Sequence, residues 1–301
     1  MRYSFTVPTE FNLKSTIYSH GWCALLPFSV KKEDNRLTRI FELPTGKILT
    51  PNIAEQKKND RNILSISTEQ KLSPIEQKHL TQQIKTCLRL DEKYDVFYQL
   101  AGAHKDFNWI PQLGAGRLLR APTVFEDVVK MICTTNCSWA LTEIMVENLC
   151  KKMGIQVSET EFTFPNPEAI ADSSEKYIRK EIRAGYRAPY LLELSKRLVK
   201  NELEIEQWRT SDLPTEELFK LVRSVKGIGP YAAGNILKLL GRYDYLAIDS
   251  WCRANFFEKH RNGRKTTDKV IEKFYKPLGE WRGLFFWLDL TQYWYQKEFT
   301  F

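Results

Sequence analysis

The stretch LFKLVRSVKGIGPYAAGNILKLLGR limits the fold of this chain more than any other part of the sequence. Apolar residues recur at helical spacing before a Gly-Ile-Gly turn, and Pro230 then stands in the first turn of a second helix. Gly227 and Gly229 allow backbone conformations and close approaches that a side chain would block, while Ile228 between them can enter the core. The pattern predicts two helices joined by a tight hairpin at about residues 215–240.

The predicted hairpin has a surface suited to an anion. The backbone amides around Gly229 and at the start of the second helix would point outward, where they can bind a phosphate. A Gly-x-Gly pattern before a helix indicates by itself no more than a turn. The formal net charge of +8 favours a polyanionic partner, but charge alone does not identify nucleic acid.

The chain changes in character at about residue 72. Before it, β-rich runs (YSFTV, WCALLPFSV, LTRIFEL, NILSIS) alternate with turn or charged segments (KKEDN, PTGK, EQKKNDRN), which predicts a small antiparallel sheet. Ser73 is a predicted N-cap with Pro74 at the first helical position. Further predicted helices lie in FEDVVKMICTTNCSWALTEIMVENLCKKMG, YLLELSKRLVKNE, TEELFKLVRSV, YAAGNILKLLGR and TTDKVIEKFYK. The predicted fold class is α+β, with a β domain (1–72) preceding a mainly α-helical domain (73–301).

The order of these motifs resembles a known superfamily. LVRSVKGIGPYAAGNILKLLGRYDYLAIDSWCR resembles the helix-hairpin-helix and Gly/Pro/Asp signature of the base-excision DNA glycosylases. Upstream, GRLLRAPTVFEDVVKMICTTNCSWALTEIMVENLCKKMG and AGYRAPYLLELSKRL resemble helices of the 8-oxoguanine and alkylpurine (3-methyladenine) branches, and the opening sheet fits their N-terminal domain. The resemblance is firmest over residues 100–256. It implies a helical glycosylase core and an enzyme that flips a damaged purine out of duplex DNA and hydrolyses its N-glycosidic bond.

Asp249 is the predicted catalytic residue. It stands twenty positions beyond Gly229, after the apolar run YLAI, and matches the aspartate that active members of the superfamily use. Cleavage of a base from deoxyribose develops positive charge on the sugar, which a carboxylate stabilises while it orients the attacking water. The alternative role is the N-cap of a helix that begins near Ser250, and the two roles are compatible.

The residue two positions after the second hairpin glycine decides between two reactions. Bifunctional members of the family have a lysine there, whose amine forms a Schiff base with the sugar and leads to strand cleavage. This sequence has Tyr231, and because a phenol cannot form that Schiff base, we expect a monofunctional hydrolase without AP-lyase activity. Lys226 and Lys238 are alternative amines, although Lys226 is more simply a phosphate contact and Lys238 a solvated helix lysine.

The resemblance also suggests how a flipped base is accommodated. Asn136 in CTTNCSW matches an asparagine that enters the vacated base stack in the 8-oxoguanine branch, with a helix cap as the alternative. Aromatic rings should line the base pocket, because stacking contributes roughly 1–3 kcal/mol per base. The candidates are Tyr231, Trp139, Trp251 and Trp287, and each tryptophan could instead be a core residue. The predicted phosphate contacts are Lys226, Gly227, Gly229 and Arg253.

One ion is expected and no other cofactor is required. The resemblance implies a monovalent cation bound by main-chain carbonyls, which here belong to Arg223, Val225 and Ile228. The six cysteines are scattered, with no CxxC pair and no C-terminal cluster of the kind that holds an iron-sulfur cluster. Cys133 and Cys137, one helical turn apart, are expected to be buried thiols rather than metal ligands.

The predicted partner is double-stranded DNA containing a damaged base, bound by a monomer. No stretch predicts a membrane span or a secretory leader, so the expected location is the cytoplasm and nucleoid of a bacterium or the nucleus of a eukaryote. Alkylated or deaminated purines are the favoured substrates, with 8-oxoguanine as the alternative. A non-catalytic DNA-binding protein is a further alternative that Asp249 disfavours, since its carboxylate would repel phosphate.

Overall fold

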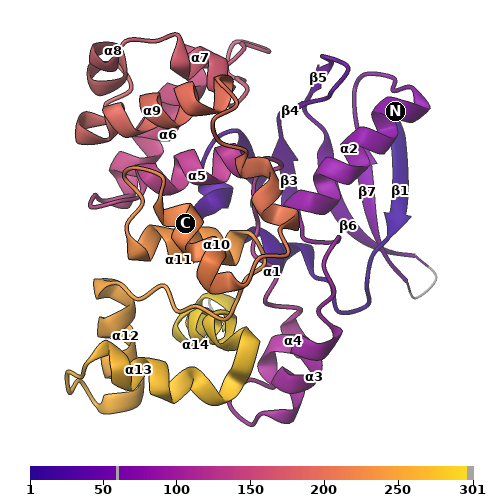
Figure 1. Cartoon of the computed structure of the whole chain (residues 1–301). Helices are drawn as coiled ribbons and strands as arrows, with labels where there is room; N and C mark the ends of the chain where they lie inside the picture. The colour runs from indigo at the N-terminus through magenta and orange to yellow at the C-terminus, as the bar shows by residue number, and fades with distance from the viewer. Residues whose placement is uncertain (59–60, 297–301) are drawn as a thin grey trace.

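The computed structural model describes residues 1–58 and 61–296, which form a small sheet packed on a larger helical body (Figure 1). The described residues form a five-stranded antiparallel sheet in the order β1-β7-β6-β3-β2. These strands are β1 (Arg2–Thr6), β2 (Phe28–Lys31), β3 (Arg36–Arg39), β6 (Asn52–Lys58) and β7 (Arg61–Ser67). A separate hairpin pairs β4 (Phe41–Glu42) with β5 (Ile48–Leu49). The predicted antiparallel sheet is confirmed.

Two segments of this N-terminal region differ from the prediction. The charged segment EQKKNDRN does not simply separate strands, because β6 continues through Lys58 and pairs with β7. Backbone pairing along β7 outweighs the unfavourable strand propensity of these lysines, whose side chains are exposed. Asn59 and Asp60 in the middle of the segment lie outside the described residues. Of the expected β-rich run WCALLPFSV, only FSV lies in a strand, β2, while its first three residues lie in a 3-10 helix, η1 (Gly21–Ala24).

The first helix after the sheet begins where the sequence predicts. Helix α2 starts at Pro74, and Ser73 and Glu76 form a reciprocal capping box at its N-terminus. The other helices are α1 (Leu13–Ile17), α3 (Asp95–Ala103), α4 (Trp109–Leu113), α5 (Val124–Cys133), α6 (Trp139–Met153), α7 (Pro167–Ala171), α8 (Glu175–Lys180), α9 (Ala188–Val199), α10 (Thr215–Arg223), α11 (Pro230–Leu239), α12 (Ser250–Arg261), α13 (Asp268–Tyr275) and α14 (Arg282–Gln296), with α2 ending at Cys87. Further 3-10 helices are η2 (Gly185–Arg187), η3 (Ile205–Thr210) and η4 (Lys276–Trp281). The predicted α+β class is confirmed.

Helix α14 is the main element absent from the sequence prediction. Its segment GLFFWLDL lacks polar alternation because α14 is buried on several faces, with Leu284, Phe285 and Phe286 fully buried. Asp289 is tolerated there because it accepts from the Tyr275 hydroxyl and pairs with Lys259 at 2.8 Å. Among the described helices, none is both long and apolar enough to cross a membrane.

The sheet shares one of three hydrophobic clusters with several of the helices. Leu64 and Ile66 of β7 pack in the same cluster as Ile84 of α2 and Ile132 of α5. A buried charged group reinforces the contact, since Glu126 of α5 lies 2.8 Å from Arg39 of β3 and 2.7 Å from Lys130. Burial would raise the pKa of Glu126, but the two cations lower it below its usual value. The N-terminal region therefore packs directly against α5, one of the helices near the candidate site.

Candidate functional site

A cavity of about 780 Å³ lies where the N-terminal region meets the C-terminal helices. Its walls come from η1, from the turn between α5 and α6, and from α11, α12 and α14. The residues of the predicted site that line it are Asn136, Trp139, Tyr231, Asp249, Trp251, Arg253 and Trp287. The hairpin residues predicted to hold phosphate or a cation lie outside this lining. The cavity therefore gathers residues that are more than one hundred positions apart in the sequence.

Asp249 stands at the N-terminus of α12 with its side chain on the cavity wall. Its Oδ1 accepts from the Cys252 backbone N–H at 2.7 Å, so Asp249 is the N-cap of α12. The partial positive charge of a helix N-terminus stabilises an ionised carboxylate. The capping role that the sequence left as an alternative is confirmed, and it places the carboxylate at the cavity.

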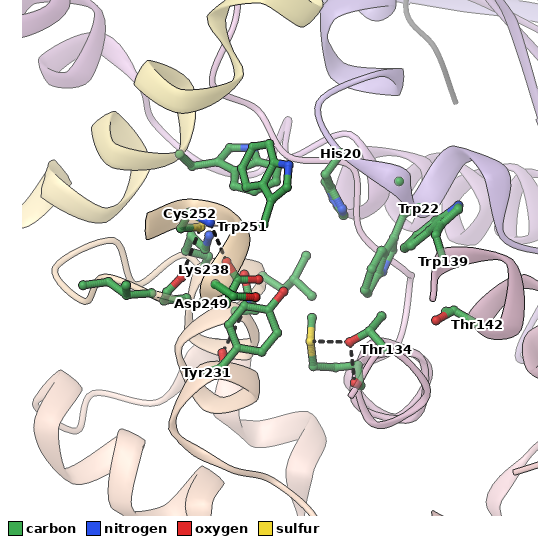
Figure 2. A pocket seen from close by; sticks show the side chains of 18 of the residues that line it. His20, Trp22, Thr134, Trp139, Thr142, Tyr231, Lys238, Asp249, Trp251 and Cys252 are labelled. Carbon is green, nitrogen blue, oxygen red and sulfur yellow. Dashed lines mark hydrogen bonds between the residues drawn. The ribbon is translucent and has the colours of Figure 1, made fainter. Parts of the chain in front are cut away.

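Tyr231 lies beside Asp249 near the start of α11 (Figure 2). Burial and then the adjacent Asp249 charge raise the pKa of the Tyr231 hydroxyl above its usual value. The phenol is therefore neutral at physiological pH and available as a hydrogen-bond donor. This geometry provides a polar contact for a ligand next to the carboxylate, but no amine.

Lys238 is buried in the cavity wall, which contradicts its prediction as a solvated helix lysine. Only 4% of the residue is exposed, and its Nζ lies 4.7 Å from the centroid of the Trp287 ring. Burial lowers the pKa of Lys238 to about 8, although the nearby Cys252 and Asp249 act in the opposite direction. The prediction was wrong because it treated α11 as a surface helix, whereas α11 is packed along most of its length. The seven-residue spacing from Tyr231 places both side chains on one helix face and could have indicated the cavity.

Aromatic rings form two walls of the cavity. Trp251 lies 6.0 Å from Trp287 and 5.9 Å from Trp294 between ring centroids. On the opposite wall, Trp22 and Trp139 flank the space (Figure 2). Gly21 permits this arrangement, since a Cβ there would overlap the indole ring of Trp139. The predicted pocket tryptophans thus meet around one space, joined by two others that no motif indicated.

His20 adds a neutral polar group that the sequence analysis missed. Its Nε2 lies 2.5 Å from the Leu119 carbonyl oxygen, and because a carbonyl can only accept, Nε2 carries the hydrogen and Nδ1 is an acceptor. Burial lowers the pKa of His20 to about 3, so the imidazole carries no charge at neutral pH. Thr134, Thr142 and Cys252 also line the cavity. No local pattern marks these residues, since only tertiary packing brings them to the site.

Asn136 is exposed at the cavity edge, in the turn between α5 and α6. Its backbone has φ of +48°, a left-handed conformation that asparagine adopts more readily than most residues. Helix α5 is capped by Thr134 and α6 by Ser138, so the alternative role of Asn136 as a helix cap is wrong. Its Nδ2 donates to the Tyr186 hydroxyl at 3.4 Å. The Asn136 side chain therefore lies at the surface and does not cap either helix.

The hairpin between α10 and α11 has the predicted form, but its two glycines have different roles. Gly227 has φ of +89°, and a Cβ there would overlap the ring of Tyr190. Gly229 has ordinary extended φ and ψ as the N-cap of α11, and nothing lies within 4 Å of where its Cβ would be. Ile228 is 5% exposed, as expected for a residue that enters the core. The open surface is thus at Gly229, while Gly227 is required by the turn itself.

The predicted cationic phosphate contacts have acidic neighbours within the chain. Lys226 pairs with Glu193 at 3.0 Å, and Arg253 forms a bidentate pair with Asp268 at 2.7 Å. Both pairs are at least partly exposed, so their strength is modest and an incoming phosphate can compete for the cation. Binding of phosphate by these residues stays a prediction.

The expected cation site is a feature of the backbone. Ile228 N–H donates to the Val225 carbonyl at 3.1 Å, which closes the turn that contains two of the three predicted ligand residues. Carbonyl oxygens suit a hard monovalent cation, but its binding stays a prediction. In the described part of the chain, no group of three or more His, Cys, Asp or Glu could hold a metal. The cysteines are free thiols, and Cys137 lies beyond the end of α5 and is only partly buried, not buried as predicted.

Known proteins resemble this chain in sequence and in fold. Residues 129–280 match the sequence model of the HhH-GPD superfamily base excision DNA repair proteins. A probable N-glycosylase/DNA lyase of Methanothermobacter thermautotrophicus is 26% identical over 224 residues, covering 66% of this chain and 70% of that protein. The 3-methyladenine DNA glycosylase of Archaeoglobus fulgidus has a TM-score of 0.76 at 18% identity, covering 97% of this chain and 99% of the other. The 8-oxoguanine glycosylase/lyase of Clostridium acetobutylicum, in complex with double-stranded DNA, has a TM-score of 0.72 at 18% identity, with 98% of each chain covered.

Proposed function

This chain belongs to the HhH-GPD superfamily of base excision DNA repair proteins, and we propose that it excises a damaged purine from double-stranded DNA by hydrolysis of the N-glycosidic bond. The observation that supports this most is the position of Asp249, whose carboxylate lies on the wall of an aromatic cavity of about 780 Å³. That volume is ample for a single base. The hairpin that precedes Asp249 has open space beside Gly229, where the DNA backbone could approach the start of α11.

The proposed reaction begins with extrusion of the nucleotide into the cavity. Unstacking and unpairing cost a few kcal/mol, and stacking of the base on the tryptophan rings offsets part of that cost. Asn136 lies exposed at the cavity edge, where its side chain can occupy the space that the base leaves in the duplex. Phosphate on either side would contact the amides near Gly229, with Lys226 and Arg253 supplying positive charge. A monovalent cation held by the hairpin carbonyls would add to that charge.

Asp249 acts at the bond that breaks. As the base departs, the sugar gains oxocarbenium character, and the carboxylate stabilises this charge and accepts a proton from the attacking water. The cap bond from Cys252 N–H fixes the Asp249 side chain, which reduces the reorganisation that the transition state requires. Tyr231 stands close enough to orient either water or the carboxylate.

We propose that the reaction stops at base release, without AP-lyase activity. Tyr231 occupies the hairpin position at which a lysine would form the Schiff base, and its phenol stays neutral. The Methanothermobacter and Clostridium proteins carry lyase in their names, so this proposal sets the present chain apart from them. The burial of Lys238 in the same cavity favours a second candidate, a lyase that uses this displaced amine.

Base release from defined duplexes tests the proposed function. End-labelled DNA would carry hypoxanthine, ethenoadenine, 8-oxoguanine or 7-methylguanine, and strand breaks would be measured with and without alkali for the wild type and Asp249→Asn. Alkali-dependent breaks that the variant loses would support a monofunctional glycosylase. Breaks without alkali, together with borohydride trapping, would favour the lyase. Tight binding without release of any base would contradict the proposed enzyme and favour a DNA-binding protein.

A further inference from the structure

We propose that Lys238 determines which bases this cavity accepts. Its ammonium group donates a hydrogen bond to a neutral base that bears a carbonyl, protonates that base as it leaves, and repels a base that alkylation has made cationic. The assignment rests on the proposed glycosylase function and narrows its substrate to neutral, carbonyl-bearing bases such as hypoxanthine or 8-oxoguanine.

The described surroundings of Lys238 leave its ammonium group without a hydrogen-bond acceptor, which a ligand could supply. Within the described part of the chain, its Nζ has no hydrogen-bond or ion-pair partner, and its contact is with the face of Trp287. Burying an ammonium group without a partner is unfavourable, so such groups are rare unless a ligand completes them. Lys238 is also part of the cavity lining rather than of the closed core. A carbonyl oxygen from a flipped base is the kind of acceptor that this donor lacks.

The other titratable groups in the cavity leave the role of an unpaired cation to Lys238. His20 is neutral at physiological pH, because burial lowers its pKa to about 3. Arg253 is already engaged in a bidentate pair with Asp268. Tyr231 stays neutral, and burial raises the pKa of the Cys252 thiol to about 12. Lys238 is thus the cavity cation that is both buried and without an acidic hydrogen-bond partner in the described residues.

The chemistry of the leaving group gives Lys238 a catalytic role. When the bond between the anomeric carbon and the purine nitrogen breaks, the electron pair remains on the base. A neutral purine would leave as an anion, which the ammonium stabilises and then protonates, becoming an amine. Water adds to the sugar and gives one proton to Asp249, and Asp249 then releases that proton to solvent. Lys238 then regains a proton from solvent, so that the net reaction consumes one water and releases the neutral base and an abasic sugar.

A cationic alkylated purine gains no such assistance from the Lys238 ammonium. Such a base leaves as a neutral molecule and needs no proton, so the ammonium offers it no assistance. The rings of Trp251, Trp287 and Trp294 would by themselves attract a cation, but Lys238 already occupies the face of Trp287. Two positive charges close together in the cavity repel each other. The same residue therefore favours one class of lesion and disfavours the other.

Single-turnover base release from matched duplexes tests the role of Lys238. Rates for hypoxanthine and for 7-methylguanine, corrected for spontaneous loss, would be measured for the wild type, Lys238→Met, and the exposed-lysine control Lys78→Met. We expect Lys238→Met to slow hypoxanthine release by about 10²-fold or more while 7-methylguanine release is unchanged or faster. Lys78→Met should behave as the wild type. Melting temperatures and affinity for undamaged duplex would establish that Lys238→Met is folded and binds DNA.

The pH dependence supplies an independent signature. Wild-type hypoxanthine release should fall as pH rises through about 8, where Lys238 loses its proton, and this limb should be absent from Lys238→Met. The neighbouring groups with shifted pKa values do not account for such a limb: the pKa of His20 is about 3, that of Cys252 is about 12, and the pKa of Tyr231 is raised above its usual range.

Three outcomes would overturn the assignment. An unchanged ratio of the two release rates in Lys238→Met would remove its role in selectivity, and wild-type preference for 7-methylguanine would reverse it. A borohydride-trapped complex that requires Lys238 would make the residue a nucleophile instead of a proton donor. In each case loss of all base release in Asp249→Asn would still support the glycosylase, whereas a wild type that releases no base would contradict the glycosylase itself.

Discussion

At the scale of single residues, the Asp249 carboxylate combines an observed structural role with a proposed catalytic one. Its Oδ1 caps α12, yet the same side chain lies on the cavity wall beside Tyr231. Asparagine caps helices about as well as aspartate, whereas alanine does not. Substitutions can therefore separate the two roles.

We predict that Asp249→Asn keeps the stability of the wild type within about 0.5 kcal/mol but slows base release by about 10²- to 10⁴-fold. Asp249→Ala should lose the activity and also about 1 kcal/mol of stability, because the Cys252 N–H loses its acceptor. Chemical denaturation and single-turnover kinetics on the same preparations measure both quantities. Equal activity of Asp249→Asn and the wild type would contradict a catalytic carboxylate.

Lys238 should make the protein less stable than it could be. Its pKa is lowered from 10.5 to about 8, so at pH 7 the folded state carries a cost of about 3 kcal/mol for the buried charge. We predict that Lys238→Met raises the free energy of unfolding by up to this amount at pH 7. As pH rises from about 8 towards 10.5, the folded wild type releases its proton before the unfolded chain, and the difference should shrink. Urea denaturation at pH 7 and pH 9.5 measures it, and a destabilised variant at pH 7 would contradict the prediction.

At the scale of elements, the hairpin between α10 and α11 connects the proposed DNA-binding surface to the cavity. Its turn requires Gly227, whose positive φ and contact with Tyr190 exclude a side chain. Gly229 faces open space, so its small size matters for what approaches from outside. From Pro230 onward, α11 carries Tyr231 and Lys238 on one face into the cavity.

The two glycines of the hairpin form a matched pair for a test. We predict that Gly227→Ala destabilises the fold by about 1–3 kcal/mol, since it combines backbone strain with a steric clash. Gly229→Ala should leave stability almost unchanged but weaken binding to duplex DNA, because its methyl group projects where a phosphate would approach. Thermal unfolding and fluorescence anisotropy with labelled duplex distinguish the two effects. Wild-type DNA affinity of Gly229→Ala would argue against phosphate at this turn.

At the scale of the whole molecule, η1 packs in one hydrophobic cluster with the sheet, α5 and α11, while α14 packs in two further clusters beside it. His20 and Trp22 come from the N-terminal region, whereas Lys238 and Trp287 come from the far end of the chain. Trp287 Nε1 donates to the Ser19 carbonyl at 3.0 Å, which joins the two regions at the cavity. The cavity therefore exists only while both regions stay docked.

The buried pair of cations around Glu126 allows a test of that docking. We predict that Glu126→Gln destabilises the protein by about 3–5 kcal/mol, because it leaves Arg39 and Lys130 buried without a compensating charge. Because the core is shared, unfolding followed by circular dichroism and by tryptophan fluorescence should show one common transition in the wild type. Separate transitions for the two signals would indicate that the sheet and the helices unfold independently.

Local patterns in the sequence determined much of this protein. The Gly-Ile-Gly turn, the Ser73 cap, the alternating strands and Asp249 at the start of α12 follow from backbone preferences that act over a few residues. Only the tertiary structure decided the burial of Lys238, the α14 helix and the contribution of His20. A buried helix loses the polar face that would reveal it, and a lysine in an apolar run has the same sequence pattern whether water or a cavity lies beyond it. Packing between segments more than two hundred residues apart settles that difference, because the environment of a side chain depends on what the rest of the chain brings against it.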